Sequence, residues 1–197
     1  MIKNMNRMRF PLLSSALVVA AVLMSGCGGV DDTNTVVSSQ SALSANVTIY
    51  RLYQPITVEH FYTNSLAEAD SAVANLGFQR EDFGNFSLYA GPDHENTVAF
   101  YRCFVYGYEG APDTWMKHFY TTDANCEANG LRAVKENILG YIGTNVPCTE
   151  RRIPLYRMYH PGVTDHFYTT SASERDGAEA TPNSWHTEFI SGFVPAP

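Results

Sequence analysis

Short runs of alternating apolar and polar residues recur at three places along the chain, and each run leads into a second run and a helical pattern. YRLY from Tyr50, YRCF from Tyr101 and YRMY from Tyr156 alternate and are rich in aromatic residues, which predicts strands. HFYT follows each of them and predicts a second strand. A further pair of strands is expected behind each helix, in FQREDFGNFSLYA, VKENILGYIG and WHTEFISGFV.

The helical segments begin at residues that cap helix N-termini well. The three equivalent capping positions are Ser65, Asp123 and Ser171. Glu68 and Glu174 follow the two serines by three residues, which predicts a capping box in copies one and three. The predicted apolar face of the first helix consists of Leu66, Ala69, Val73 and Leu76. Gly77 is expected to end this helix.

These elements belong to three copies of one sequence unit. From the tyrosine that precedes the repeated arginine to the repeated histidine is ten residues in copies one and three and 17 in copy two. Copy two therefore carries a seven-residue insertion around 107–115. The period of about 50 residues divides the folded part, 47–197, into repeats at about 47–97, 98–150 and 151–197.

The repeats indicate the fold class. One unit cannot bury its own apolar face, whereas three units can close a ring. We predict a mostly β fold with short helices, in which the three internal repeats form one pseudo-threefold, β-trefoil-like domain. A small propeller-like ring is the alternative.

The first 46 residues carry a different pattern, which is typical of an exported lipoprotein. Three basic residues precede an apolar stretch from Phe10 to Met24 that is too short to span a bilayer comfortably. Ser25-Gly26-Cys27 resembles the bacterial lipobox, which predicts a signal peptide over 1–26 and acylation of Cys27. Gly28 in place of Asp favours transport to the outer membrane, by resemblance to the Gram-negative sorting rule. The polar, small residues of 27–46 predict a flexible tether between the lipid bilayer and the domain.

Charge argues against one class of partner. The chain has a net charge of -7, and without residues 1–26 it has 10 basic against 20 acidic residues, a net charge of -10. Such a surface repels phosphate backbones, so we expect no nucleic-acid partner.

The repeated phrases resemble a known family. PLYRMYHPGVTDHFYTTSASERD, from Pro154, is similar to a secreted bacterial and fungal repeat domain of unknown function with a consensus of roughly PLYRLYNP…DHFYTTSASERD…GY..EGIAGYV. The resemblance covers residues 47–194. Copy two departs from it through the insertion, and copy one through Asp82, which stands where Gly is usual. Because the family occurs alone and appended to cell-wall lysins and other secreted hydrolases, the resemblance implies an accessory, surface-binding role.

Charged residues that recur once in each copy predict structural pairs. Equal numbers and equal periods of arginine and glutamate favour one ion pair per repeat, which ties the first strand to the third. The expected pairs are Arg51 with Glu81, Arg102 with Glu136, and Arg157 with Glu188. The alternative is that each arginine projects into a pocket and binds a carboxylate or a sugar hydroxyl.

The repeated histidines and tyrosines are the candidate ligand-binding residues. A histidine can bond the neighbouring turn or face a ligand, and three histidines on one axis could bind zinc, which we consider less favoured, so no metal or cofactor is predicted. A tyrosine beside arginine or histidine can stack on a sugar ring, and a tryptophan in a unique loop is a binding signal. The candidates are His60, Tyr62, Trp115, His118, Tyr120, His166 and Tyr168.

Three cysteines follow Cys27, and an exported protein can form disulfides. Cys126 and Cys148 have no counterparts in the other copies, which favours a bridge between them. Cys103 takes an apolar strand position and reads as a buried small residue, with Cys103–Cys148 as the competing pair.

Enzyme signatures are missing from the sequence: it contains no G-x-S-x-G, no H-E-x-x-H and no P-loop. We therefore expect a membrane-anchored extracytoplasmic lipoprotein that contacts the bilayer through acylated Cys27. Its repeat domain is expected to bind a glycan or cell-wall polymer without catalysis. The alternatives are a structural or protein-interaction module, such as an inhibitor, and, least favoured, a secreted hydrolase.

Overall fold

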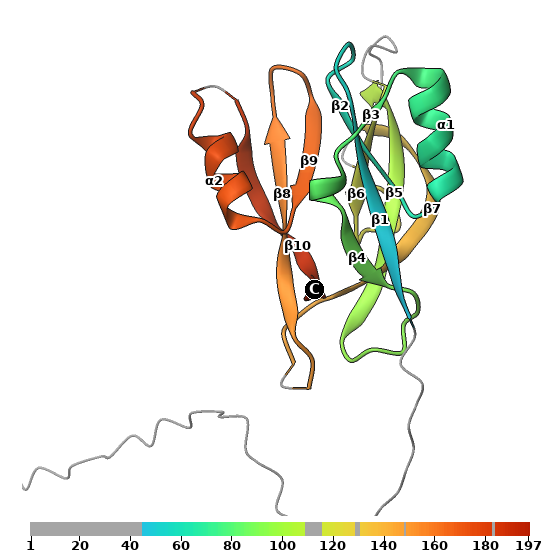
Figure 1. The fold of residues 1–197 in the computed structure, drawn as a ribbon, viewed down its shortest axis with the longest axis vertical. Helices are drawn as coiled ribbons and strands as arrows, with labels where there is room; N and C mark the ends of the chain where they lie inside the picture. The colour runs from blue at the N-terminus through green and yellow to red at the C-terminus, as the bar shows by residue number, and fades with distance from the viewer. Residues whose placement is uncertain (1–44, 109–115, 129–130, 148, 183) are drawn as a thin grey trace, which may run out of the picture. The chain divides into compact units, whose positions relative to one another are not determined.

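The computed structural model describes residues 45–108, 116–128, 131–147, 149–182 and 184–197. Four predicted features lie outside these residues: the signal segment with Cys27, nearly all of the tether, Trp115 and Cys148. Within them, ten strands and two α-helices are present, so the prediction of a mostly β fold with short helices is confirmed (Figure 1). Neither of the described α-helices has the length and apolar character needed to cross a membrane.

The first repeat has the predicted order of elements. It runs through β1 (Asn46–Gln54), β2 (Glu59–Thr63), α1 (Leu66–Leu76), β3 (Gln79–Arg80), a 3-10 turn (Asp82–Gly84) and β4 (Phe86–Tyr89). The turn falls where the sequence departs from the family wording. A side chain could not replace the hydrogen of Gly84, because a Cβ atom there would lie 2.0 Å from Cζ of Arg51.

The second and third repeats differ from the prediction in their last part. They run through β5 (Thr97–Tyr108), β6 (Lys117–Thr121), β7 (Leu131–Gly143), β8 (Arg152–His160), β9 (Asp165–Thr169), α2 (Ala172–Glu179) and β10 (His186–Pro195). In place of the expected strand pair, repeat two has one long strand, β7, and repeat three has one long strand, β10. Register shifts in the pairing with β5 and β8 accommodate the bend that a turn provides in repeat one.

Identical register in the three hairpins explains why the phrase recurs. Each hairpin places the repeated arginine opposite the repeated tyrosine, and the residue two positions after the arginine opposite the repeated histidine. The arginine–tyrosine pairs are Arg51 with Tyr62, Arg102 with Tyr120 and Arg157 with Tyr168. Because side chains alternate along a strand, arginine, tyrosine and histidine share one face of every hairpin.

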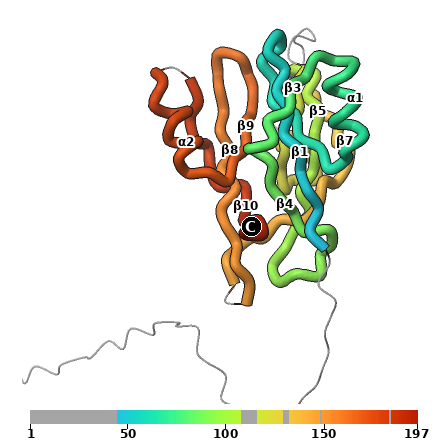
Figure 2. Tube along the Cα trace, in the orientation of Figure 1, coloured from blue at the N-terminus to red at the C-terminus, as the bar shows by residue number. Residues whose placement is uncertain are grey.

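The strands pair as one open sheet in the order β2-β1-β4-β7-β10-β8-β9, to which β3 adds through β1, and β5 and β6 add through β7. The repeats also touch cyclically, since β2, β6 and β9 contact one another and so do β4, β7 and β10. In Figure 2, β8, β9 and α2 of repeat three lie at the left, and the strands of repeats one and two lie at the right with α1. The helices α1 and α2 thus lie on opposite outer sides. The trefoil-like arrangement stays a prediction.

Both predicted helix caps are present, with one difference in the capping box. The Ser65 and Ser171 hydroxyls accept hydrogen bonds from the Glu68 and Glu174 backbone N–H groups, each at 3.2 Å. The glutamate side chains do not return to the serine N–H, which instead donates to the threonine that ends HFYT, Thr63 or Thr169. The two carboxylates are thereby free to contact other repeats.

The predicted apolar face of α1 is confirmed at Ala69 and wrong at its other three residues. Ala69 and Ala72 are buried against Leu52 and Phe61, whereas Leu66, Val73 and Leu76 are 52%, 40% and 63% exposed. Small alanine side chains let the helix approach the hairpin closely, so the larger residues are displaced to its flanks. Gly77 ends the helix in the left-handed region, as predicted (φ 74°).

Repeat two has a turn where a helix was predicted. The Asp123 carboxylate accepts from the N–H groups of Asn125 and Glu127, so it caps the chain as expected. Cys126 and Glu127 then adopt positive φ values of 54° and 51°, which turn the chain away from a helical path.

The predicted disulfide is also wrong, because the structure joins Cys103 to Cys126. This pairing excludes both Cys126–Cys148 and the competing Cys103–Cys148. In repeat one, Leu52 packs beneath α1; in repeat two, Cys103 takes the place of Leu52 and bonds to the turn that replaces the helix. The disulfide therefore substitutes for the helix packing that this repeat lacks.

We expect reduction of this disulfide to lower the free energy of unfolding by about 3 kcal/mol, the chain-entropy value for a loop of its size. Its two cysteines are 23 residues apart in the sequence. Urea unfolding with and without reductant measures the change, and a Cys103→Ala, Cys126→Ala variant should no longer respond to reductant. Non-reducing peptide mapping that recovers Cys126 joined to Cys148 would contradict the pairing.

Candidate functional site

Three tyrosines form a closed hydrogen-bonded ring in the core, which we call the tyrosine ring (Tyr62, Tyr120 and Tyr168). Each hydroxyl donates to the backbone carbonyl of another member, at 2.7–3.1 Å, and accepts from that member's N–H, at 2.6–2.9 Å. Each is 1% exposed, and burial raises the pKa of all three hydroxyls, so they stay protonated donors. Their assignment to ligand binding is therefore wrong: they join the repeats.

Each repeated arginine lies against the glutamate that the sequence pairs with it. Nε of Arg102 and of Arg157 donates to Glu136 and Glu188, in both cases at 2.7 Å. Nε of Arg51 is 2.9 Å from Glu81, as an ion pair whose angle does not meet hydrogen-bond geometry. All three arginines are buried.

The same arginines also bind a carboxylate of a neighbouring repeat, which the sequence did not predict. Arg102 binds Glu68 of repeat one at 2.8 and 3.0 Å, and Arg51 binds Glu174 of repeat three at 2.7 and 3.2 Å. Arg157 binds Glu127 of repeat two at 2.5 Å. The links run from one to two, two to three and three to one, so they close a cycle.

The repeated histidines form a second set of links between repeats. Nδ1 of His118 is 2.7 Å from Glu59 of repeat one, and Nδ1 of His60 is 2.8 Å from Asp165 of repeat three. The same carboxylates accept the backbone N–H of the histidines. Each carboxylate belongs to the residue that directly precedes the histidine of its own repeat.

The third link is broken because repeat two has Lys117 at this position. Its ammonium donates to the carbonyls of Thr57 and Val58 in repeat one. Nδ1 of His166 consequently has no hydrogen-bond partner among the described residues. The other ring nitrogen, Nε2, lies 3.1 Å from Arg157 and 3.3 Å from Glu188.

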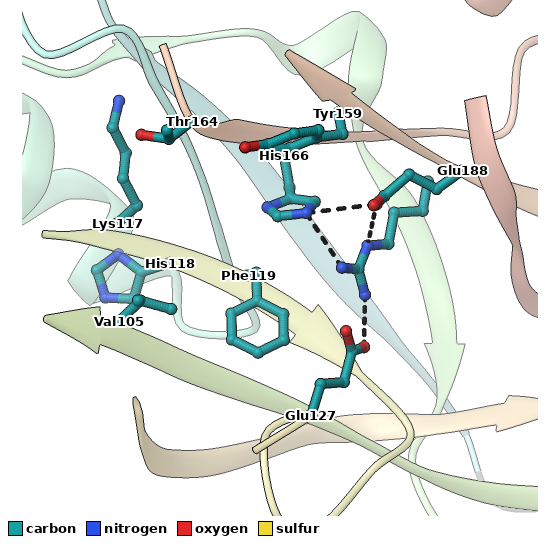
Figure 3. A pocket seen from close by; sticks show the side chains of 10 residues that line it. Val105, Lys117, His118, Phe119, Glu127, Tyr159, Thr164, His166 and Glu188 are labelled. Atoms are coloured by element: carbon teal, nitrogen blue, oxygen red, sulfur yellow. Dashed lines mark hydrogen bonds and ion pairs between the residues drawn. The ribbon is translucent and has the colours of Figure 1, made fainter. Parts of the chain in front are cut away.

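A cavity of about 250 Å³ lies at this interface, and we call it the 2–3 pocket (Figure 3). Repeat two supplies the charged groups Lys117 and Glu127, and repeat three supplies His166, Arg157 and Glu188. The remaining lining residues are Val105, His118, Phe119, Tyr159 and Thr164. Two apolar rings and several hydrogen-bonding groups thus face one cavity, which is the usual composition of a small-molecule site.

The equivalent interface between repeats one and two also contains a cavity, the 1–2 pocket, of about 320 Å³. Its charged lining is Arg102, Glu59, Glu68 and Glu136, beside His118. At the interface between repeats three and one, Trp185 packs on His60 and Phe167, with ring centroids 5.4 Å apart in both contacts. His118 and His166 therefore line pockets, whereas His60 is buried against Trp185 and is not placed to meet a ligand.

A separate polar cluster lies near the ends of the repeats. Arg152 donates to Glu150 and to the hydroxyl of Tyr89, and it also binds the carbonyls of Glu95 and Asn145. The guanidinium ties three loops together, which gives it a structural role. Over the described parts of the chain, no cluster of three or more His, Cys, Asp or Glu side chains could hold a metal ion.

The stability of the fold depends on pH, because glutamates and a histidine that form these links gain or lose protons. Burial acts to raise the pKa of Glu68, Glu174 and Glu188, but hydrogen bonds to Arg102, Arg51 and His166 outweigh it and leave the pKa lowered. For His118, burial acts to lower the pKa, but hydrogen bonds to Glu136 and Glu59 outweigh it and raise it. The glutamates thus stabilise the fold above their unfolded value of 4.5 and lose this effect as the pH falls. His118 stabilises below 6.5 and loses its effect as the pH rises through its folded value.

We therefore expect the urea midpoint to be highest at about pH 5.5 and lower at about pH 3.5 and pH 8. His118→Gln should flatten the alkaline decline and leave the acid decline in place. A midpoint that does not fall between pH 5.5 and pH 8 in the wild-type protein would contradict the role given to His118.

Comparison with known proteins now gives the family. A family model described as a domain of unknown function (DUF5648) matches the chain twice, over residues 31–134 and 111–195. The chain belongs to this family. The two overlapping DUF5648 matches are consistent with a repeated domain. Searches of curated proteins and of solved structures each returned no match.

Two residues of the candidate site were missed by sequence reasoning, although the signals were there. Lys117 is the one basic residue among Glu59, Lys117 and Asp165, which occupy one aligned position of the DUF5648 repeats. Glu127 is displaced by one position relative to Glu68 and Glu174, because Cys126 takes the aligned place. Both departures from the repeat line the 2–3 pocket.

Proposed function

We propose that this DUF5648 protein is a non-catalytic binding module of the bacterial cell envelope that holds a glycan in the 2–3 pocket. The observation that carries the proposal is the position of the pocket at the interface where the cycle of histidine–carboxylate links is interrupted. An interface that served only to hold the repeats together would be expected to keep the histidine–carboxylate link that the other two interfaces have.

The lining suits a sugar better than an apolar ligand. Tyr159 offers a ring surface above the buried Phe119, while Thr164 and Lys117 offer hydrogen-bonding groups. Each sugar hydroxyl can both donate and accept, so a mixed lining of this kind can satisfy it. Figure 3 shows these side chains around one cavity, with Lys117 and Thr164 on the same side.

The carboxylates of the pocket are poorly suited to glycoside hydrolysis. A general acid needs a raised pKa, whereas the pKa of Glu188 is lowered: burial acts to raise it, but a hydrogen bond to His166 and the charge of Arg157 outweigh burial. Glu127 is bound to the same guanidinium at 2.5 Å. These acids therefore serve as ion-pair partners.

The proposal includes the arrangement and the location of the domain. The cyclic contacts of the tyrosine ring and of the arginines support a pseudo-threefold, trefoil-like arrangement of the repeats. The sequence of the first 46 residues supports a lipoprotein that is anchored through Cys27 in the outer membrane. Cys27→Ser should remove the protein from the detergent phase on partitioning, and unchanged partitioning would contradict the anchor.

A glycan array that includes peptidoglycan fragments tests the binding function on the purified full chain. Val105→Trp should abolish binding, because Val105 lines the pocket and a larger side chain fills it. Val98→Trp is the matched control, since Val98 is 38% exposed and lies outside the pocket. Retention of no glycan by the wild-type chain, or equal binding by both variants, would overturn the proposal.

A further inference from the structure

Two of the three interfaces contain a carboxylate held in the same way. At each, one acidic side chain accepts from the Nδ1 and from the backbone N–H of the next repeat's histidine. The acids, Glu59 and Asp165, are 7% and 0% exposed. The fold therefore builds a carboxylate-binding position from one histidine ring and one peptide N–H, and it uses this position twice.

The third interface has the same histidine without the acid. Tyr159 and His166 occupy the register of Tyr53 and His60, so the backbone N–H of His166 points away from its hairpin partner as that of His60 does. Nε2 of His166 lies 3.1 Å from Nη2 of Arg157, which can only donate. In the neutral form that accepts from Arg157, the imidazole carries its proton on Nδ1. In the charged form that donates from Nε2 to Glu188, Nδ1 carries a proton as well. In both forms Nδ1 is a donor, and it is the atom that pairs with a carboxylate at the other interfaces.

Lys117 adds a positive charge where the other repeats have a negative one. Two of its ammonium protons are used by the carbonyls of Thr57 and Val58, which leaves one donor. In Figure 3, Lys117 and Thr164 lie on the side of the His166 ring that faces away from Glu188. The two residues that line this side of the pocket therefore offer three donors: the Nδ1 and backbone N–H of His166 and the ammonium of Lys117.

The two pockets also differ in their charged side chains, and this difference favours an anion in the 2–3 pocket. The 1–2 pocket is lined by three acidic side chains and Arg102, whereas the 2–3 pocket is lined by Glu127 and Glu188 against Lys117 and Arg157. In the 1–2 pocket an anion would add to an excess of acidic side chains. In the 2–3 pocket the acidic and basic side chains are equal in number. The ion pairs of Arg157 with both glutamates leave Lys117 as the cation without a carboxylate partner in the pocket.

We propose that the ligand of the 2–3 pocket is an acidic sugar, an inference that rests on the proposed glycan-binding function. The carboxylate of this sugar takes the position that Glu59 and Asp165 occupy at the other interfaces. Its carboxylate accepts from His166 and Lys117, and its ring lies against Tyr159. The ligand class is thus a sugar carboxylate, such as a uronic acid or a lactyl-substituted amino sugar.

Saturation-transfer NMR on the purified full chain with D-glucuronate and D-glucose tests this assignment. Glucuronate should bind, and glucose should bind at least about tenfold more weakly, because a charge-assisted hydrogen bond is lost. Lys117→Glu should abolish glucuronate binding, since it supplies the carboxylate internally. Lys135→Glu makes the same charge change at an exposed position outside the pocket and should bind as the wild type does. Circular dichroism establishes that both variants are folded.

The outcomes separate the two proposals. Equal binding of glucuronate and glucose, lost in Val105→Trp, would overturn the carboxylate assignment and keep the glycan pocket. Failure of both sugars to bind would overturn the assignment, while the glycan array decides the wider function. Binding of N-acetyl-aspartate in place of glucuronate, dependent on Lys117, would overturn the sugar and point to an acidic peptide.

Discussion

Arg157→Ala is expected to lower the free energy of unfolding by about 3–5 kcal/mol, the range for removal of one partner from a buried ion pair. The guanidinium is 5% exposed and binds Glu127 of repeat two and Glu188 of its own repeat. Its loss leaves two carboxylates close together without a counter-charge. It also removes the arginine–carboxylate link between repeats two and three.

Urea unfolding of the purified variant measures this effect, with Arg151→Ala as the control. Arg151 is exposed, so its substitution should change stability by no more than about 0.5 kcal/mol. Arg157→Lys should also be destabilising, because one ammonium cannot reproduce the forked geometry that serves both carboxylates. If the Arg157 and Arg151 variants unfold at the same urea concentration, the arginine does not join the repeats.

The second large effect is expected for Tyr120→Phe. The hydroxyl of Tyr120 donates to the carbonyl of Tyr62 and accepts from its N–H, so its removal leaves a buried donor and a buried acceptor unpaired. Each such group costs about 1–3 kcal/mol, which predicts a total loss of about 2–6 kcal/mol. A deletion of one oxygen atom on the surface has almost no effect by comparison.

Tyr101→Phe makes the same chemical change at a partly exposed strand position outside the tyrosine ring. Its free energy of unfolding should remain within about 0.5 kcal/mol of the wild type. Thermal and urea unfolding of both variants give the comparison. Equal stability of the two would mean that water or a local shift satisfies the groups left by Tyr120, and that the ring does not secure the core.

The structure gives every residue of the repeated HFYT phrase a task. In two of the three repeats, histidine binds the acid of the preceding repeat, as His118 binds Glu59. Phenylalanine packs under the next repeat's arginine, as Phe61 lies 5.0 Å below Arg102. Tyrosine closes the ring in the core, and threonine accepts the N–H that begins the helix or turn. Because each task needs its own chemical group, the phrase is repeated with few changes.

The elements and the pairs within each repeat could be predicted because they depend on local patterns. Alternation identified the strands, serine followed by glutamate identified the helix starts, and equal periods joined each arginine to its own glutamate. The contacts between repeats could not be predicted, because they depend on which face of each hairpin is turned toward its neighbour. For this reason the tyrosines were assigned to a ligand, although they are buried.

The remaining errors come from positions that depart from the repeat. Cys126 has no counterpart in the other copies, and its partner depends on how the turn after β6 folds back over Cys103. Ala69 and Ala72, rather than the larger residues, face the core because the helix lies close to the hairpin. A departure from a repeat signals that one copy differs, and only the fold shows whether the difference is structural or belongs to a site.

The claim that the 2–3 pocket binds the ligand is tested most directly by hydrogen–deuterium exchange of the full chain with and without the glycan that binds best on the array. We predict slower exchange in peptides that contain Lys117 and His166, with little change in peptides that contain Glu68 or Ala72 of the 1–2 pocket. Protection confined to the 1–2 pocket, or protection outside both pockets, would contradict the account.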